Sequence, residues 1–180
     1  MRGLMLAPAL FLTASAFAQQ PAGVGNFHIV NDRLYRGAQP TDEGFANLAK
    51  MGVKTILDVR EYDSRSLAEK KVVEAAGMRY VNIPMHGMTS PSPADIAKAL
   101  ALFDNQEAGP VFIHCRRGAD RTGTVVACYR IAHDRWKNEK ALSEARSMGM
   151  AWIEKAMQHY IRDYKPPVQN ASAANTAGTN

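Results

Sequence analysis

The most informative stretch of this 180-residue chain is VFIHCRRGADRTG, which spans Val111 to Gly123. Its first four residues form a largely apolar strand candidate after the chain-breaking pair Gly109-Pro110. This strand leads into a seven-residue loop from Cys115 to Arg121, and a helix is predicted over residues 122–134. A strand that passes through a short loop into a helix is typical of α/β folds.

The loop has the composition of an anion-binding site. Backbone N–H groups from Arg116 to Arg121 can curl around a tetrahedral anion at the N-terminus of a helix. Gly118 allows a backbone conformation that a side chain would penalise. Arg121 can clamp two phosphate oxygens with its planar guanidinium, which Lys could not reproduce. The candidate phosphate-binding residues, besides Arg121, are Arg116, Arg117, Gly118, Ala119 and Thr122.

The same positive field predicts that Cys115 is a nucleophile. A helix N-terminus and neighbouring cations favour the thiolate form of a cysteine. Attack by Cys115 on phosphorus would form a phosphocysteine, which water then hydrolyses. Thr122 is placed to donate a hydrogen bond to the sulfur, and His114 to orient the loop. A lone cysteine is more often a buried core residue, but the spacing to Arg121 favours the catalytic interpretation.

The pattern His114-Cys115-x-x-Gly118-x-x-Arg121-Thr122-Gly123 resembles the signature of the protein tyrosine and dual-specificity phosphatase superfamily. A second motif, LYRGAQP over residues 34–40, resembles the N-terminal motif of its compact, atypical dual-specificity members, including exported bacterial tyrosine phosphatases. The resemblance in element order covers residues 27–160. Within that motif, Tyr35 and Arg36 either line the rim of the site or only begin the fold.

One departure from the family concerns the proton donor to the leaving oxygen. The family places an Asp on a loop well before the cysteine, but residues 85–93 of this chain contain no Asp or Glu. Three substitutes are available. Asp120, inside the loop beside Arg121, is our first choice as a catalytic residue. Asp95 is better explained as a charge at a helix N-terminus, and His86 could donate a proton when its imidazole is protonated.

The rest of the chain alternates between strand and helix patterns. Helices are predicted over residues 42–51, 66–76, 94–106, 122–134, 139–148 and 151–164, and strands over 27–30, 34–36, 53–59, 78–83 and 111–114. Thr41 is a candidate N-cap for the first helix. This alternation predicts a single α/β domain over residues 27–165, in which helices flank a mainly parallel central sheet, as in the cysteine-dependent phosphatase fold.

The two termini are predicted to lie outside this domain. Residues 1–18 combine Arg2, an apolar run and the small residues of Ala16-Phe17-Ala18, which is the pattern of a secretory signal peptide. Residues 19–26 are expected to be a flexible N-terminus and residues 166–180 a disordered tail. We therefore expect an exported, periplasmic protein with no stable membrane association after signal cleavage.

Two cysteines in an exported protein would ordinarily suggest a disulfide. Cys115 and Cys128 are 13 residues apart, and Cys128 falls within the helix that follows the loop. The rise of that helix should keep the two sulfurs too far apart to bond. Cys128 is therefore expected to be a small buried apolar residue, and Cys115 a free thiol that peroxide would oxidise readily.

The net charge of +5 is scattered along the chain, which suits an anionic substrate but does not indicate nucleic acid. Together with the resemblance, this predicts hydrolysis of phosphate monoesters on a phosphorylated protein, with phosphotyrosine first, or on a small phosphorylated substrate. An inositol-polyphosphate or phosphoinositide phosphatase and a non-catalytic phosphate-binding module remain alternatives. A rhodanese-type sulfurtransferase fits the Arg121-Thr122-Gly123 ending less well. No cofactor is expected, and no ligand cluster accompanies His114 and Cys115 to form a metal site.

Overall fold

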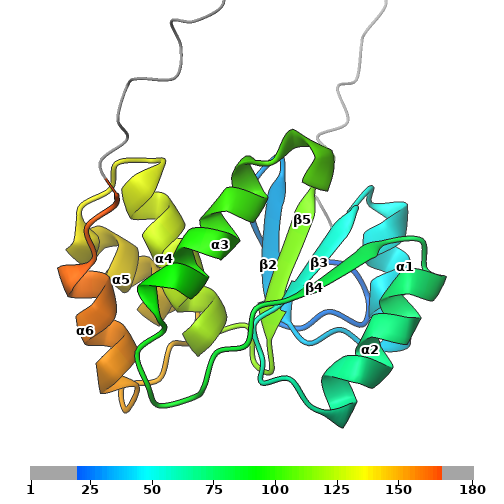
Figure 1. Ribbon diagram of the computed structural model, residues 1–180, viewed down its shortest axis with the longest axis horizontal. Coiled ribbons are helices and arrows are strands. Elements are labelled where there is room, and N and C mark those ends of the chain that lie inside the picture. Colours follow the sequence, from blue (N-terminus) through cyan, green and yellow to red (C-terminus); the bar gives the residue numbers. More distant parts are fainter. Residues whose placement is uncertain (1–19, 168–180) are drawn as a thin grey trace, which may run out of the picture.

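The computed structural model describes residues 20–167, which form one α/β domain (Figure 1). The predicted signal peptide and most of the predicted C-terminal tail lie outside the described residues. No helix within residues 20–167 is long and apolar enough to cross a membrane. The elements, in chain order, are β1 (His28–Asn31), β2 (Leu34–Ala38), α1 (Asp42–Lys50), β3 (Thr55–Asp58), α2 (Ser64–Ala75), β4 (Arg79–Asn82), α3 (Pro93–Asp104), a 3-10 turn (Gln106–Ala108), β5 (Val111–Cys115), α4 (Asp120–Ala132), α5 (Asn138–Ser147) and α6 (Lys155–Asp163).

The central sheet has five strands in the order β1-β2-β5-β3-β4. All neighbouring pairs are parallel except β1 and β2, which form an antiparallel hairpin at one edge. The prediction of a mainly parallel sheet is therefore confirmed. The register opposes Ala38 of β2 to Cys115, and Asp58 of β3 to His114. Strand β5 thus brings its last residues between the ends of two parallel neighbours, where ligands bind in open α/β sheets.

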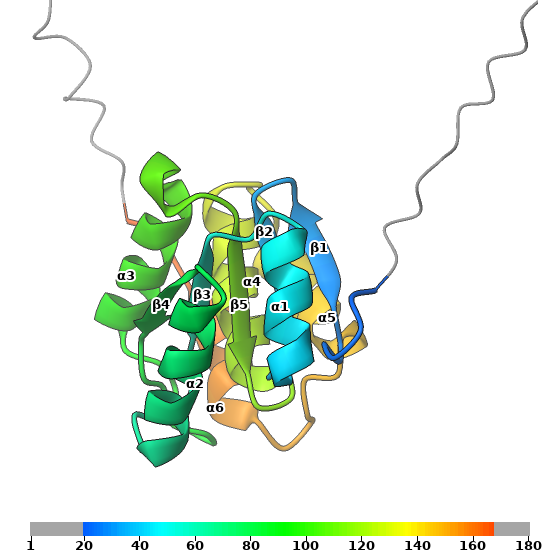
Figure 2. The ribbon, with the colours of Figure 1, turned by 90° about the vertical axis from the view of Figure 1, so that its right-hand side faces the viewer.

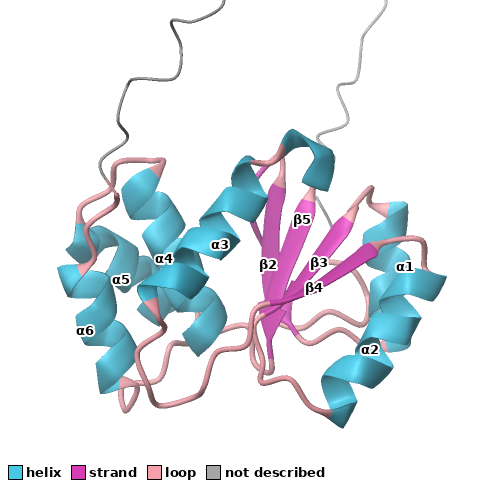
Figure 3. Ribbon diagram, viewed as in Figure 1, coloured by secondary structure: helices cyan, strands magenta, loops and turns pink. Residues whose placement is uncertain are grey.

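Helices cover both faces of the sheet, as Figures 1 and 2 show. Helices α1 and α2 lie on one face, over a core that includes Phe45, Leu48 and Phe112. Helices α3 to α6 lie on the other, where α4 packs against α3, α5 and α6. Strand β5 is buried along its whole length, because both of its faces are covered. Figure 3 shows the loops that follow β3, β4 and β5 gathered at one end of the sheet.

The starts of the helices are set by their caps. Helix α1 begins after Thr41, as predicted, and the side chain of Thr41 accepts a hydrogen bond from the N–H of Gly44. Helix α2 begins two residues earlier than predicted, because Asp63 accepts from Arg65 and Ser66 in a capping box.

The last helix, α6, starts four residues later than predicted, at Lys155. The preceding backbone is held by tertiary contacts instead of helical ones. The N–H of Ala151 donates to Asp120, and its carbonyl accepts from the side chain of Gln158.

Candidate active site

The Cys115–Arg121 loop joins the buried end of β5 to the first turn of α4. The Cys115 side chain is inside the protein, with 2% of the residue exposed. Among the described residues, no backbone carbonyl accepts a hydrogen bond from the N–H groups of residues 116–119. Unpaired N–H groups at a helix N-terminus are suited to an anion. The strand–loop–helix geometry predicted from the sequence is therefore present, although α4 begins at Asp120 and not at Thr122.

The floor of this loop is formed by β2. Gly118 has a positive φ of 68°, and a Cβ atom there would lie 2.2 Å from the carbonyl carbon of Gly37. Only glycine permits this close approach. The N–H of Gln39 also donates to the carbonyl of Arg116. The LYRGAQP motif thus has a direct structural role, because its strand supports the loop from below.

Arg36, within the same motif, is completely buried under the loop. Its Nη2 donates to the carbonyl oxygen of Gly118 at 2.7 Å, whereas its Nε and Nη1 have no partner among the described residues. Burial lowers the pKa of Arg36 to about 10, and the negative charges of Glu144 and Cys115 limit that fall. The side chain therefore stays a cation at neutral pH. The sequence left open whether Arg36 lines the rim of the site or only begins the fold. Arg36 does neither, because it is buried and supports the loop from beneath.

Arg121 projects from the first turn of α4 toward the loops that follow β3 and β4. Its Nη1 donates to the carbonyl of Met85 at 3.1 Å and lies 3.4 Å from Oε2 of Glu61. An adjoining pocket of about 260 Å³ carries mainly positive charge. It is lined by Gln39, Arg60, Glu61, Arg65, Arg116 and Arg121. Arg116 and Arg117 are both exposed.

Asp120 has both carboxylate oxygens engaged. Oδ2 lies 2.6 Å from Nη2 of Arg117, and Oδ1 accepts from the N–H of Ala151 at 2.8 Å. Asp120 thus connects the loop to the segment before α6. Its role as general acid stays a prediction, but no oxygen of this carboxylate is free. Thr122 is fully buried, and the expected hydrogen bond from its hydroxyl to the Cys115 sulfur does not form among residues 20–167.

The two other candidate proton donors differ in placement. Asp95 lies in the first turn of α3, where it accepts from the hydroxyl of Ser92 and pairs with Lys98. These contacts lower the pKa of Asp95, first through the Ser92 hydrogen bond, and they match the helix-terminal role considered for it. His86 is 76% exposed, and its Nδ1 lies 3.5 Å from Oε1 of Glu61.

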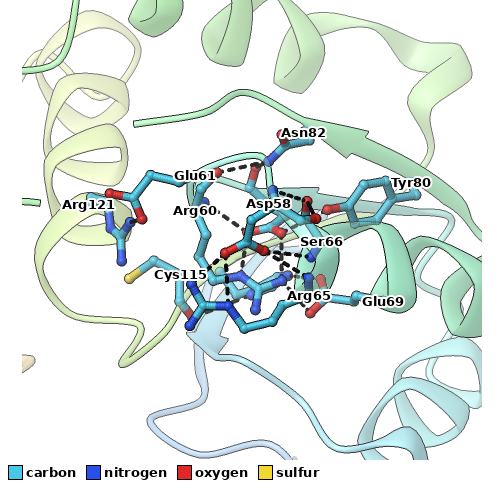
Figure 4. A network of polar contacts seen from close by, with 12 residues as sticks. Asp58, Arg60, Glu61, Arg65, Ser66, Glu69, Tyr80, Asn82, Cys115 and Arg121 are labelled. Carbon is cyan, nitrogen blue, oxygen red and sulfur yellow. Dashed lines mark hydrogen bonds and ion pairs between the residues drawn. The ribbon is translucent and has the colours of Figure 1, made fainter. Parts of the chain in front are cut away.

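A buried polar network stands behind the loop (Figure 4). The Arg60 guanidinium donates to Asp58 through Nε and Nη2, and Nη2 also contacts Glu69 at 2.7 Å. Nε2 of His114 lies 2.8 Å from the second oxygen of Glu69, and Nδ1 lies 3.4 Å from the carbonyl of Cys115. His114 therefore contacts the loop backbone, as predicted. Through Glu69 and Arg60, the His114 side chain also connects the loop to α2 and to Asp58 at the end of β3.

The hydrogen bonds and ion pairs of this network shift the pKa values of Asp58 and Tyr80. Burial alone would raise the pKa of Asp58, but the hydrogen bonds from Arg60 and the nearby His114 hold it below its usual value. Burial and the adjacent Asp58 raise the pKa of Tyr80, whose hydroxyl donates to Oδ2 of Asp58. Ligand atoms of Asp58, Glu69 and His114 lie within 4.8 Å of one another. The Arg60 guanidinium already pairs with both carboxylates, which makes these residues a poor metal site.

Four residues that shape the site were not predicted from the sequence: Arg60, Glu61, Glu69 and, as a buried cation, Arg36. Asp58, Arg60 and Glu61 end or follow β3, a strand parallel to β5, and charged residues there could have been suspected of reaching the site. Glu69 offered no such signal, because a Glu within a helix is usually solvated.

The structure confirms the prediction that Cys128 is a buried residue. It is fully buried in α4 and is a free thiol, as is Cys115. Burial strongly raises the pKa of Cys128, so this residue stays protonated and unreactive at neutral pH. Of the two cysteines, Cys115 is the one that leads into the loop.

Known proteins share this architecture. A family model described as "DSP-PTPase phosphatase fused to NAD+ Kinase" matches residues 25–163. The dual specificity protein phosphatase TpbA of Pseudomonas aeruginosa is 31% identical over 138 residues, which are 74% of this chain and 59% of that protein. The inositol diphosphatase DSP3 of Arabidopsis thaliana is 29% identical and is covered to 66%, so the chain spans about three fifths to two thirds of these relatives.

Solved structures of such phosphatases have a similar fold. The crystal structure of P. aeruginosa TpbA has a TM-score of 0.66 and 27% identity, covering 81% of this chain and 92% of that one. The catalytic core of the Saccharomyces cerevisiae PP-IP phosphatase SIW14 has a TM-score of 0.66 and 26% identity, covering 78% and 86%. With the matched loop signature and the parallel sheet beneath it, the chain belongs to the family of cysteine-dependent protein tyrosine and dual-specificity phosphatases.

Proposed function

We propose that this protein hydrolyses phosphate monoesters through a phosphocysteine at Cys115, with Arg121 binding the transferred phosphoryl group. The observation that carries the proposal is the Cys115–Arg121 loop. At residues 116–119 its N–H groups have no hydrogen-bond partner among residues 20–167, and they lie beside a buried thiol at a helix N-terminus. Such a cradle binds the three outer oxygens of a phosphoryl group as charge develops on them. Arg116 and Arg117 add positive charge at the exposed rim.

Hydrolysis of p-nitrophenyl phosphate under reducing conditions tests this function. We expect Cys115→Ser to lose roughly 10³-fold or more in kcat, since the nucleophile is removed. Arg121→Lys should lose about 10²-fold, because an ammonium cannot bind two oxygens in a fork. Cys128→Ala is the matched control and should keep its activity. An inactive wild type that still binds vanadate would identify a phosphate-binding module instead.

We propose phosphotyrosine in proteins as the substrate class. TpbA, a structural relative at 26% identity, has been crystallised in complex with phosphotyrosine, and its domain aligns over 81% of this chain. The alternative is an inositol polyphosphate, which is favoured by the arginine-lined pocket beside Arg121 and by the relatives named inositol diphosphatases. The ratio of kcat/KM for a phosphotyrosyl peptide to that for a soluble inositol polyphosphate decides between them.

We further propose that the protein is exported to the periplasm. The support is the sequence pattern of residues 1–18, which ends in Ala16-Phe17-Ala18. Expression of the full chain with fractionation and N-terminal sequencing tests this proposal. A periplasmic product that begins at Gln19 is expected, and an unprocessed chain in the cytoplasmic fraction would contradict it.

A further inference from the structure

The reaction proposed above requires a proton donor for the leaving oxygen, and the loop of residues 85–93 offers no carboxylate. The acids closest to the motif are engaged elsewhere. Both oxygens of Asp120 are occupied by Arg117 and Ala151, and the carboxylate of Asp95 contacts Ser92 and Lys98 in α3. A donor needs an oxygen that is not held by short hydrogen bonds, so that it can reach the substrate.

Glu61 meets this requirement, because both of its oxygens make only long contacts: Oε2 lies 3.4 Å from Nη1 of Arg121, and Oε1 lies 3.5 Å from Nδ1 of His86. It lies in the loop between β3 and α2, and its side chain is 44% exposed. Figure 4 shows the carboxylate pointing toward Arg121, and Oε2 lies 3.4 Å from Nη1 of that arginine. Among residues 20–167, Glu61 is the one acidic residue lining the pocket beside the loop. A group within contact distance of the phosphate clamp can also reach an oxygen of a phosphate held there.

We propose that Glu61 is the general acid of this enzyme. The inference rests on the proposed phosphatase function. In the first step the Cys115 thiolate attacks phosphorus, the bond from phosphorus to the leaving oxygen breaks, and that oxygen takes the proton of the Glu61 carboxyl. In the second step the Glu61 carboxylate takes a proton from water. That water attacks the phosphocysteine, and the sulfur leaves as a thiolate.

Basic side chains from several elements surround the Glu61 carboxylate and the adjoining pocket. Arg121 of α4 and His86 after β4 contact its carboxylate, and three further arginines line the same pocket: Arg60, Arg65 and Arg116. A phosphate bound by Arg121 takes over the interaction that this arginine makes with Oε2 of Glu61, which leaves that oxygen able to turn toward the leaving group.

A leaving-group series separates proton donation from a positioning effect on Arg121. We would compare kcat/KM of wild type and Glu61→Gln for p-nitrophenyl phosphate, phenyl phosphate and phosphotyrosine. Nitrophenolate leaves without protonation, whereas the tyrosine hydroxyl, with a pKa of about 10, requires it. The expected loss for Glu61→Gln is about 10²-fold or more on phosphotyrosine and phenyl phosphate, and under about tenfold on p-nitrophenyl phosphate.

Controls make each outcome decisive. Glu74→Gln is the same substitution on an exposed Glu near the end of α2 and should match wild type on all substrates. Vanadate binding checks that Glu61→Gln keeps an intact anion site. An equal loss on all leaving groups, or no loss, overturns the proposal. So does a steep leaving-group dependence in Asp120→Asn or His86→Gln in place of Glu61→Gln.

The results for Cys115→Ser and Glu61→Gln distinguish a failure of the phosphocysteine mechanism from a failure of the Glu61 assignment. If Cys115→Ser is as active as wild type on p-nitrophenyl phosphate, the phosphocysteine mechanism is wrong, and Glu61 has no role to test. If Cys115→Ser is inactive while Glu61→Gln shows no selective loss on poor leaving groups, only the assignment of Glu61 is wrong. The alkaline limb of the kcat profile adds a second readout, because loss of a general acid should flatten it in Glu61→Gln.

Discussion

Arg36 illustrates how one residue can serve the site without contacting solvent. Two nitrogens of this buried guanidinium have no partner among residues 20–167, which is unfavourable for folding because desolvation of the charge is incompletely offset. Its place beneath Gly118, with the Cys115 charge acting on it, suggests a functional reason for tolerating that cost. A fixed cation in a region shielded from water favours a nearby anion more strongly than a surface charge does.

We predict that Arg36→Met slows alkylation of Cys115 by iodoacetamide at neutral pH by about tenfold or more, because the buried cation beneath the loop is removed. Arg36→Lys keeps the charge and should retain most of the reactivity. Alkylation followed by mass spectrometry measures this directly, with Arg79→Met on the exposed start of β4 as the control. If Arg36→Met only lowered thermal stability and left the reactivity of the folded protein unchanged, the cation would be structural.

At the scale of elements, the site depends on the contact between β2 and the Cys115–Arg121 loop. Parallel pairing with β5 places Gly37 and Ala38 directly beneath Gly118. The two backbones pack so closely that a Cβ on Gly118 would overlap Gly37 and Ala38, and the N–H of Gln39 donates to the carbonyl of Arg116. The short motif of residues 34–40 and the cysteine motif, although far apart in sequence, therefore form one structural unit.

Gly118→Ala tests this contact. The added methyl group would collide with the Gly37 carbonyl, so we expect the loop to be displaced, with kcat/KM lowered by about 10²-fold or more. Gly77→Ala is the matched control: its φ is also positive, at 77°, but a Cβ there meets no atom within 4 Å. That variant should lose only about 1 kcal/mol of stability and no activity. Equal activities of the two variants, measured by aryl phosphate hydrolysis, would contradict the prediction.

At the scale of the whole molecule, the network of Asp58, Arg60, Glu69 and His114 ties three elements to the site. It links the end of β3, the helix α2 and the end of β5, and each member is at least nine-tenths buried. A buried ion pair contributes little compared with an apolar pair, but removing one partner leaves an uncompensated charge. The network should therefore make the fold sensitive to the protonation of Asp58.

We predict that Asp58→Asn lowers the free energy of unfolding by about 3 kcal/mol at pH 7. The pKa of Asp58 in the folded protein is below its usual value of 3.8, so its contribution is present above that pH and is lost as the pH falls through the lower folded value. The difference between wild type and Asp58→Asn should therefore narrow at pH 3. Urea denaturation at both pH values measures it, with Glu107→Gln as the exposed control. A difference that stays constant with pH would argue against this linkage.

The sequence by itself determined the fold class, the Cys115–Arg121 loop and the parallel sheet, because these follow from local patterns: an apolar strand, a glycine, a helix start and regular alternation of elements. It also identified Thr41 as a cap and Cys128 as a buried thiol. Only the tertiary structure decided which distant side chains complete the site. Arg36, Glu61 and Glu69 reach the loop through strand order and helix packing, and no local pattern records such long-range contacts. The engagement of Asp120 could not be predicted for the same reason. Its place in the loop follows from the sequence, but one of its oxygens pairs with Arg117 and the other accepts from Ala151, 31 residues away.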